Sequence, residues 1–337
     1  MIDNKELWER YINDTLHEIE PKEEEIEKLT HKRVIFFGTP AIAKSALEYL
    51  MQVENIEVVA VVCQPDRELN RKKEIIFQPV KQFAIEKNIP LYQPEKIIEI
   101  KSELINLNPD AIITCAYGQF VPTSILEIPK YGAFNLHASL LPKLRGGAPI
   151  HWAIINQETK TGWTLMKMVK EMDAGDYCDQ MVCEIEPNET MSSLYQKLSD
   201  LLEPFILFYL PRIFYNDTKW IQQNANDVTF AYNIKKEDRY LDFNLDAKSI
   251  DAKIRGLNAK PIALWNFKNL DIKVYEAQIL DSNHNSTNKI ISLSKDGILI
   301  STSTNDILLK IIQLPNKEKV EISQIYHNEF YKELFKE

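Results

Sequence analysis

The stretch Val34-Ile35-Phe36-Phe37-Gly38-Thr39-Pro40 decides the fold class of this chain. Its opening run of apolar residues is typical of a strand buried on both faces of a parallel sheet. Thr39 suits the N-cap of a helix and Pro40 suits the first helical position, so a helix is expected over residues 41–53. A second apolar run at residues 58–63 predicts the next strand. Strand, helix and strand in this order indicate a βαβ unit.

The same alternation continues along the chain. A helix is expected over residues 80–87, and buried strands are expected over 110–115 and 133–136. We therefore predict an α/β fold with a doubly wound, mostly parallel, Rossmann-like sheet. In such folds ligands bind at the carboxyl ends of the strands. Two longer strands within 164–186 and a long helix over 191–216 complete this part of the chain.

The pattern of the sequence changes after residue 217. A helix is expected near 247–257, and short strands separated by close polar turns are expected at 272–280, 288–294, 297–303 and 307–313. Such strands predict a small β-barrel-like domain. We therefore divide the chain into a catalytic α/β domain over residues 33–216 and a C-terminal domain over residues 217–337.

The start of the chain differs from both domains. Residues 1–33 carry ten acidic and six basic side chains. A single apolar helix face is expected from Leu7, Trp8, Tyr11 and Ile12. We read residues 1–32 as an acidic, helical or disordered extension, which is either a solvated tail or a docking helix for a partner.

Composition excludes several classes of protein. A formal net charge of -9 argues against a protein that holds nucleic acid by bulk charge, although a local basic patch stays possible. No apolar run reaches the ~18 residues of a membrane helix, and the acidic N-terminus lacks the features of a targeting peptide. The four cysteines contain no CxxC pair, which predicts reduced thiols rather than a metal or disulfide site. We expect a cytoplasmic monomer.

Glycine marks the candidate site. The chain has only nine glycines, and six of them fall between residues 118 and 175: Gly118, Gly132, Gly146, Gly147, Gly162 and Gly175. Glycine allows sharp turns and close approach of the backbone to a ligand. The clustering therefore nominates this region for binding or catalysis.

Three polar residues in this region suit catalysis: an amide donor, an imidazole and a carboxylate. Asn135 and His137 end an expected strand, and residues two apart in a strand point to the same side. Asp173 lies in a turn after a later strand, where its carboxylate would favour the charged imidazolium form of His137. On spacing alone, a structural histidine and an ordinary turn aspartate fit the same pattern.

Other motifs are missing or incomplete. The string Gly38-Thr39-Pro40 lacks the second and third glycines of a dinucleotide fingerprint. The sequence contains no P-loop, HExxH or GxSxG motif. A nicotinamide enzyme is therefore rejected as the leading hypothesis.

Two motifs together carry a family resemblance. The segment Asn135-Leu-His137-Ala-Ser139-Leu-Leu-Pro142, followed by Arg145-Gly-Gly-Ala-Pro149, resembles the signature of the 10-formyltetrahydrofolate-dependent formyltransferases. The later Met172-Asp173-Ala-Gly175-Asp176 is similar to the second signature of that family. The resemblance implies attack of a primary amine on the formyl carbon of 10-formyltetrahydrofolate, without a metal.

Three further stretches resemble the members of this family that formylate initiator methionyl-tRNA for translation initiation. They are the Phe37-Gly38-Thr39-Pro40 turn, the loop from Gln64-Pro65-Asp66-Arg67 to Pro79-Val80-Lys81, and the C-terminal part around Ile254-Arg255-Gly256-Leu257-Asn258, which resembles an OB-like tRNA-binding domain. The loop departs from the family pattern because its middle holds two acids, Glu68 and Glu74, and no glycine. Ala259-Lys260-Pro261 also replaces the usual aromatic-proline pair.

The resemblance implies roles for named residues. Asn135 and His137 would stabilise the oxyanion, and Asp173 would hold His137 charged and help to move protons. The folate would bind along Ser139, Leu140, Leu141 and Pro142, with its pterin near residues 117–120. Contacts to tRNA phosphates would come from Arg67, Arg71, Lys72 and Lys73, and further contacts from Arg145, Arg255 and Lys260.

Two alternatives remain open at this point. A formyltransferase that acts on a sugar amine or another small amine fits the catalytic residues equally well. A folate-binding protein that has lost the transfer reaction keeps the same fold. The C-terminal domain and the loop argue against the first alternative, and the intact Asn135, His137 and Asp173 argue against the second.

Overall fold

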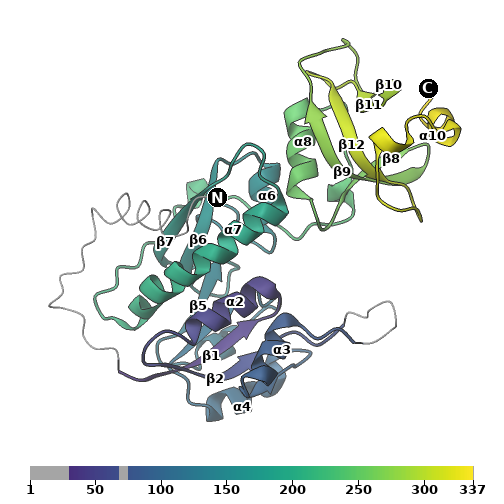
Figure 1. The fold of residues 1–337 in the computed structure, drawn as a ribbon. Helices are drawn as coiled ribbons and strands as arrows, with labels where there is room; N and C mark the ends of the chain where they lie inside the picture. The colour runs from purple at the N-terminus through teal and green to yellow at the C-terminus, as the bar shows by residue number, and fades with distance from the viewer. Residues whose placement is uncertain (1–29, 68–74, 337) are drawn as a thin grey trace.

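The computed structural model describes residues 30–67 and 75–336, and it divides them into two domains (Figure 1). The N-terminal domain contains a seven-stranded sheet in the order β3-β2-β1-β4-β5-β6-β7. Its strands are β1 (Lys32–Gly38), β2 (Ile56–Val62), β3 (Leu91–Tyr92), β4 (Ala111–Cys115), β5 (Ala133–His137), β6 (Lys160–Lys167) and β7 (Tyr177–Glu184). β1 to β5 pair in parallel, and β6 and β7 add in antiparallel fashion. The predicted mostly parallel α/β sheet is confirmed.

Helices cover both faces of this sheet (Figure 1). They are α2 (Ala41–Leu50), α3 (Pro79–Glu86), α4 (Lys101–Asn106), α5 (Thr123–Leu126), α6 (Pro149–Ile155) and α7 (Met191–Pro204), with a 3-10 turn at Ile97–Ile100. The helical path of α7 continues through a π turn (Phe205–Tyr209) and a 3-10 turn (Leu210–Phe214). The long helix expected over 191–216 is therefore present, although its last turns are irregular.

The apolar run in β1 explains the double covering. Val34 and Phe36 belong to the core that includes α2 and α7, whereas Ile35 and Phe37 belong to the core that includes α4 and α5. All four side chains have no exposed surface. Successive side chains of a strand point to opposite faces, so this one strand serves both cores.

The turn after β1 differs from the prediction. Helix α2 begins at Ala41, its N-cap is Pro40, and no side chain caps it. The prediction of Thr39 as the N-cap was therefore wrong. The Thr39 hydroxyl instead donates to the Tyr117 carbonyl (3.1 Å) and accepts from the Gln64 backbone N–H (3.2 Å). Thr39 thus ties three loops together at the carboxyl edge of the sheet.

The C-terminal domain is a smaller antiparallel sheet in the order β10-β11-β12-β9-β8, with β13 paired to β12. Its strands are β8 (Ala263–Phe267), β9 (Leu270–Ile279), β10 (Ile290–Ser294), β11 (Gly297–Ile300), β12 (Ile307–Gln313) and β13 (Val320–Glu321). The helices are α8 (Ala247–Gly256), α9 (Ile322–Ile325) and α10 (Glu329–Leu334), and 3-10 turns lie at Ala225–Asp227 and Glu237–Arg239. The predicted change to short strands is confirmed, and these strands pair in antiparallel fashion. Within the described ranges, no helix is long and apolar enough to span a membrane.

Helices α6 and α8 pack against each other where the two domains meet. A Cβ placed on Gly256 would lie 2.6 Å from Ile155 Cγ1 and 3.0 Å from the His151 carbonyl oxygen. Only glycine therefore permits this close approach. Arg255 donates to the Glu189 carbonyl (2.8 Å), and Ser192 N–H donates to the Asn258 carbonyl (3.1 Å). These contacts fix the C-terminal domain to the N-terminal domain.

Candidate active site

Asn135 stands near the carboxyl end of β5, opposite Thr114 of the neighbouring strand β4. The Thr114 hydroxyl donates to Asn135 Oδ1 across 2.7 Å. This bond leaves the Asn135 amide nitrogen as a donor, and no described residue accepts from it. Thr114 is 2% exposed and Asn135 is half-buried, so the donor side of the bond is shielded from water.

His137 is the last residue of β5 and is only 5% exposed. Its Nε2 lies 2.9 Å from the Leu144 carbonyl oxygen. Because a carbonyl only accepts, Nε2 carries the hydrogen of this bond. The other ring nitrogen, Nδ1, lies 3.7 Å from Asp173 Oδ2. Nδ1 is therefore the ring atom left for chemistry.

Asp173 reaches the site from the turn between β6 and β7. It has a positive φ of 52°, and its Oδ2 accepts from the Gly146 backbone N–H across 2.8 Å. Its carbonyl accepts from Gln223 Nε2 at 2.8 Å. No hydrogen bond to a described residue uses Oδ1. One oxygen of the carboxylate is thus fixed, and the other stays available.

The loop after β5 is held by a distant segment of the chain. Arg145 N–H donates to the Thr229 carbonyl (2.9 Å), and Ala231 N–H donates back to the Arg145 carbonyl (2.7 Å). Gly146 has a φ of 125°, and a Cβ there would lie 2.6 Å from the Ala231 carbonyl oxygen. The segment around residue 230 therefore supports the loop that holds Asp173.

The predicted folate-binding stretch forms a bonded turn beside β6. Ser139 donates its hydroxyl hydrogen to the Lys143 carbonyl (2.6 Å), and its own carbonyl accepts from the Thr164 hydroxyl (2.6 Å). The Leu141 carbonyl accepts from Gln180 Nε2 at 2.8 Å. Ser139 and Leu141 are buried, whereas Leu140 and Pro142 are partly accessible. The stretch is thus held by hydrogen bonds at several points, and it begins two residues after His137.

Residues 117–120 lie at the same edge of the sheet. Gly118 has a φ of 83°, and the Tyr117 hydroxyl is buried without a hydrogen-bond partner among the described residues. The Phe120 side chain is 70% exposed. Gln119 donates to the Pro94 carbonyl at 3.2 Å, which anchors the loop.

Cys115 ends β4 next to these residues but is no nucleophile. The side chain is 1% exposed, and burial raises the pKa of its thiol to about 12. The reactive form of cysteine is the thiolate, so Cys115 stays inert at neutral pH. Within the described part of the chain, no group of three or more histidines, cysteines or carboxylates is arranged to hold a metal ion.

The basic residues predicted to bind tRNA are spread over several elements. Arg67 is exposed and pairs with Glu95 at 2.6 Å, while Arg71, Lys72 and Lys73 lie outside the described residues. Arg145 donates from Nε to Gln223 Oε1 at 2.9 Å. Arg255 pairs with Asp251 at 2.6 Å and belongs to the domain junction.

Sequence reasoning missed two residues that position the site. Thr114 orients Asn135, and its only signal was a hydroxyl inside an otherwise apolar strand. Gln223 binds the carbonyls of Asp173 and Gly175 through Nε2 and binds Arg145 through Oε1. Gln223 is buried, and nothing in its sequence context pointed to this role.

Family comparison agrees with this architecture. Residues 32–207 match the Formyl transferase family, and residues 233–329 match the family described as Formyl transferase, C-terminal domain. The first match spans the parallel sheet with Asn135, His137 and Asp173. The second match spans the antiparallel sheet.

Similar proteins cover almost the full length of both chains. The methionyl-tRNA formyltransferase of Malacoplasma penetrans is 48% identical over 297 residues, which are 88% of this chain and 93% of the relative. The methionyl-tRNA formyltransferase of Ureaplasma parvum is 46% identical over 85% of this chain and 94% of its own. The methionyl-tRNA formyltransferase of Staphylococcus aureus is 39% identical over 86% of this chain and 93% of its own.

Solved structures share the fold at lower identity. An N-formyltransferase from Helicobacter canadensis, in complex with folinic acid and dTDP-3-aminofucose, superposes with a TM-score of 0.63 at 20% identity. It covers 85% of this chain and 100% of its own. A sugar 3N-formyl transferase gives a TM-score of 0.61 at 19% identity, with 86% and 99% covered.

The match over both domains and the identity to these relatives lead to one assignment. The chain belongs to the formyl transferase family, within its methionyl-tRNA formyltransferase branch.

Proposed function

We propose that this protein transfers the formyl group of 10-formyltetrahydrofolate to the free amino group of initiator methionyl-tRNA, with Asn135, His137 and Asp173 as catalytic residues. One observation carries the assignment of the residues. The His137 ring is tied at Nε2 to the Leu144 carbonyl, while its Nδ1 lies 3.7 Å from the Asp173 carboxylate. The family relationship to methionyl-tRNA formyltransferases supports the choice of substrates.

The reaction begins with attack of the amine lone pair on the formyl carbon. The carbonyl oxygen becomes an oxyanion, and donors aimed at that oxygen lower the barrier. The Asn135 amide nitrogen suits this role because Thr114 occupies the amide oxygen. A donor held before the reaction costs no reorganisation when the charge develops.

His137 and Asp173 suit the proton transfers. The attacking amine must lose a proton, and the leaving nitrogen of the folate must gain one. Nδ1 of His137 accepts a proton in the neutral ring and donates it in the charged ring. The Asp173 carboxylate lies 3.7 Å from Nδ1, where it would face the positive charge that the ring carries during the transfer. Its Oδ1 accepts no hydrogen bond from a described residue, and it offers a second acceptor for the amine.

Folate binding is proposed along residues 139–142. This stretch begins two residues after His137, so a folate bound there would present its formyl group to the catalytic residues. The pterin is proposed to bind near residues 117–120. The two loops come from the carboxyl ends of adjacent strands β4 and β5, which is where α/β sheets bind ligands.

The first experiment incubates the purified chain with 10-formyltetrahydrofolate and charged initiator methionyl-tRNA and follows formylmethionyl-tRNA on acid gels. We expect formylation by the wild-type protein and a rate loss of about 10²–10³-fold in His137→Ala. Folate titration checks that the variant still folds. Transfer to a free sugar amine in place of the tRNA would contradict the proposed substrate, and a rate within tenfold of wild type in His137→Ala would remove His137 from catalysis.

A further inference from the structure

Two exposed aromatic rings stack on each other beside the loop that follows β5. The ring centroids of Phe230 and Tyr232 are 5.4 Å apart, and the planes differ by only 2°. Phe230 is 49% exposed and Tyr232 is 58% exposed. Ala231, between them, is fully buried and packs with Leu144 and Ala153. Because successive residues of an extended segment point to opposite sides, residues 230 and 232 share one side, and their two rings face solvent together.

The backbone that carries these rings is fixed. Ala231 forms two backbone hydrogen bonds with the loop after β5. Its N–H donates to the Arg145 carbonyl (2.7 Å), and its carbonyl accepts from the Ala148 N–H (3.0 Å). The Tyr232 carbonyl accepts from Trp152 Nε1 at 2.8 Å. The rings therefore form a preorganised surface, which binds a ligand without a large ordering cost.

The surface is connected to the catalytic carboxylate by short steps. Gly146 N–H donates to Asp173 Oδ2, and a Cβ on Gly146 would lie 2.6 Å from the Ala231 carbonyl oxygen. Ala231 is the direct neighbour of both aromatic residues in the chain. A molecule whose amine lies at Asp173 is therefore close enough to extend over Phe230 and Tyr232.

We propose that Phe230 and Tyr232 form a stacking surface for an unpaired base in the single-stranded 3′ end of the tRNA. This inference rests on the proposed function, in which the reacting amine is attached to the last nucleotide. The nucleotides next to the amine must then lie within a short distance of Asp173. Unpaired bases stack on aromatic faces with little dependence on sequence.

Basic residues lie beside the aromatic pair in the chain and in the loop that it contacts. Arg145 pairs its backbone with the segment on both sides of Phe230, and its guanidinium contacts the neutral Gln223. Lys235 follows in the chain and is exposed. The protein as a whole carries a net charge of -9, so a nucleic acid needs a local surface of this kind. The aromatic pair supplies contact that salt does not screen.

The test compares the binding of two RNAs to the full chain. The double variant Phe230→Ala/Tyr232→Ala removes both rings, and the matched control Phe230→Tyr/Tyr232→Phe keeps them. Filter binding measures Kd for intact, uncharged initiator tRNA and for the same tRNA trimmed of its single-stranded 3′ end. We expect the double variant to lose about 10-fold to 100-fold in affinity for the intact tRNA only. The matched control should bind both RNAs as the wild type does.

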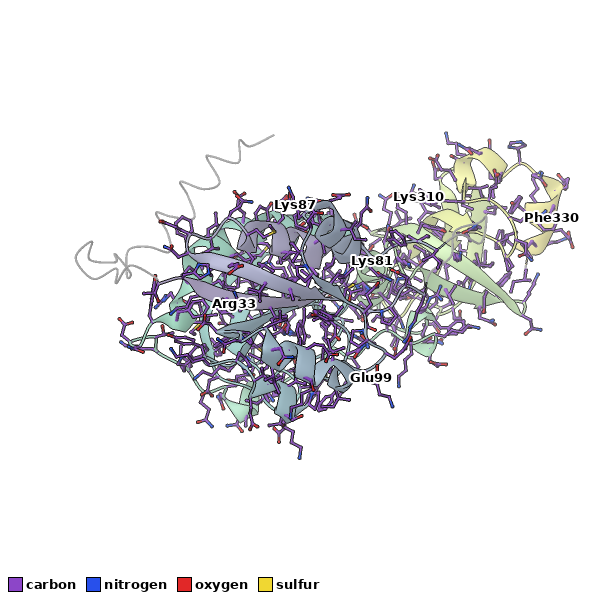
Figure 2. All side chains as sticks on the ribbon, turned by 90° about the horizontal axis from the view of Figure 1, so that it is seen from below. Arg33, Lys81, Lys87, Glu99, Lys310 and Phe330 are labelled. Atoms are coloured by element: carbon purple, nitrogen blue, oxygen red, sulfur yellow. The ribbon has the colours of Figure 1, made fainter. Side chains whose placement is uncertain are left out.

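A second aromatic control tests for a general surface effect. Phe330 is 55% exposed and lies at the outer end of the C-terminal domain (Figure 2). Phe330→Ala should leave the ratio of the two Kd values unchanged. Folate titration checks the fold of each variant, and the single variant Tyr232→Ala replaces the double variant if that one fails to fold.

The outcomes separate this inference from the proposed function. If the wild type formylates the tRNA but the double variant binds intact tRNA with unchanged affinity, only the stacking surface is wrong. An equal loss of affinity for intact and for trimmed tRNA would also overturn the stacking surface, because the aromatic pair would then contact another part of the tRNA. A wild-type protein that neither binds nor formylates tRNA would overturn both.

Discussion

The Gly146 backbone N–H donates to Asp173 Oδ2 across 2.8 Å, and so the loop after β5 holds the carboxylate that faces His137. The two residues come from the two separate motifs of the sequence. Asp173 is 15% exposed in its side chain, which limits competition from water. The backbone bond fixes one carboxylate oxygen, and it explains how a residue in a turn keeps a defined position.

Asp173→Asn removes the charge but keeps an oxygen that accepts from Gly146. We expect the variant to fold and to bind folate with unchanged affinity. Turnover should fall by about 10²–10⁴-fold, the usual contribution of a positioned acid–base group. Single-turnover formylation with saturating tRNA measures this loss. A variant that retains turnover within tenfold would show that Asp173 has only a structural role.

Thr114→Val removes the hydroxyl that orients the Asn135 amide and preserves the shape of the side chain. One hydrogen bond contributes about 0.5–1.5 kcal/mol, so kcat should fall by about 3-fold to 10-fold. KM for both substrates should stay unchanged because neither substrate contacts Thr114 in the proposed arrangement.

Thr114→Ser keeps the hydroxyl and should restore kcat, which separates positioning from packing. Steady-state kinetics on the two variants decide the matter. A fall in kcat that serine does not rescue would indicate that packing around β4 matters, rather than the bond to Asn135.

The alternation of elements was predictable because buried strands leave a strong signal. Residues 34–37 form an unbroken apolar run, and the structure places all of them in β1. Asn135 and His137 were predicted as a pair because alternate residues of a strand share a side. The two-residue strand β3 gave no comparable signal, since it is too short to show a period.

The supporting contacts of the site depend on long-range register, which no local pattern encodes. Thr114 meets Asn135 only because β4 and β5 pair in the observed register. Leu144 presents its carbonyl to His137 from a turn with a φ of 61°. Gln223 reaches the Asp173 turn from 50 residues away in the chain. Such contacts require the folded chain and could not be read from spacing.

Arg71→Ala should weaken tRNA binding with little effect on folate binding. Arg71 lies outside the described residues, and its role is expected from the basic run Arg71-Lys72-Lys73. Loss of one phosphate contact should reduce the slope of log K against log salt by about 1. Filter binding at several salt concentrations measures the slope.

Lys130→Ala is the matched control for Arg71→Ala. Lys130 is exposed and lies just before the amino end of β5, whereas His137 lies at the carboxyl end of that strand. Its removal should leave both the affinity for tRNA and the salt slope unchanged. Equal effects of the two substitutions would show that tRNA responds to overall charge and not to the loop.

His151 should make the stability of the protein depend on pH. It lies in α6, beside Gly256 at the domain junction, and its Nδ1 is buried without a hydrogen-bond partner among the described residues. Burial lowers the pKa of His151 from 6.5 to about 4. Between pH 6.5 and about 4, the unfolded chain therefore binds a proton at His151 that the folded chain does not bind.

The sign of the effect follows from this difference in bound protons. Above pH 6.5 both states are neutral at His151 and stability is unaffected, whereas the free energy of unfolding falls as pH drops from 6.5 towards 4. The slope should approach ~1.4 kcal/mol per pH unit for one proton, for a loss of about 3 kcal/mol. His151→Leu should remove this part of the slope and leave the contributions of the carboxylates. Urea unfolding of both proteins from pH 7.5 to 4.5 provides the comparison, and parallel curves for wild type and variant would contradict a buried, neutral His151.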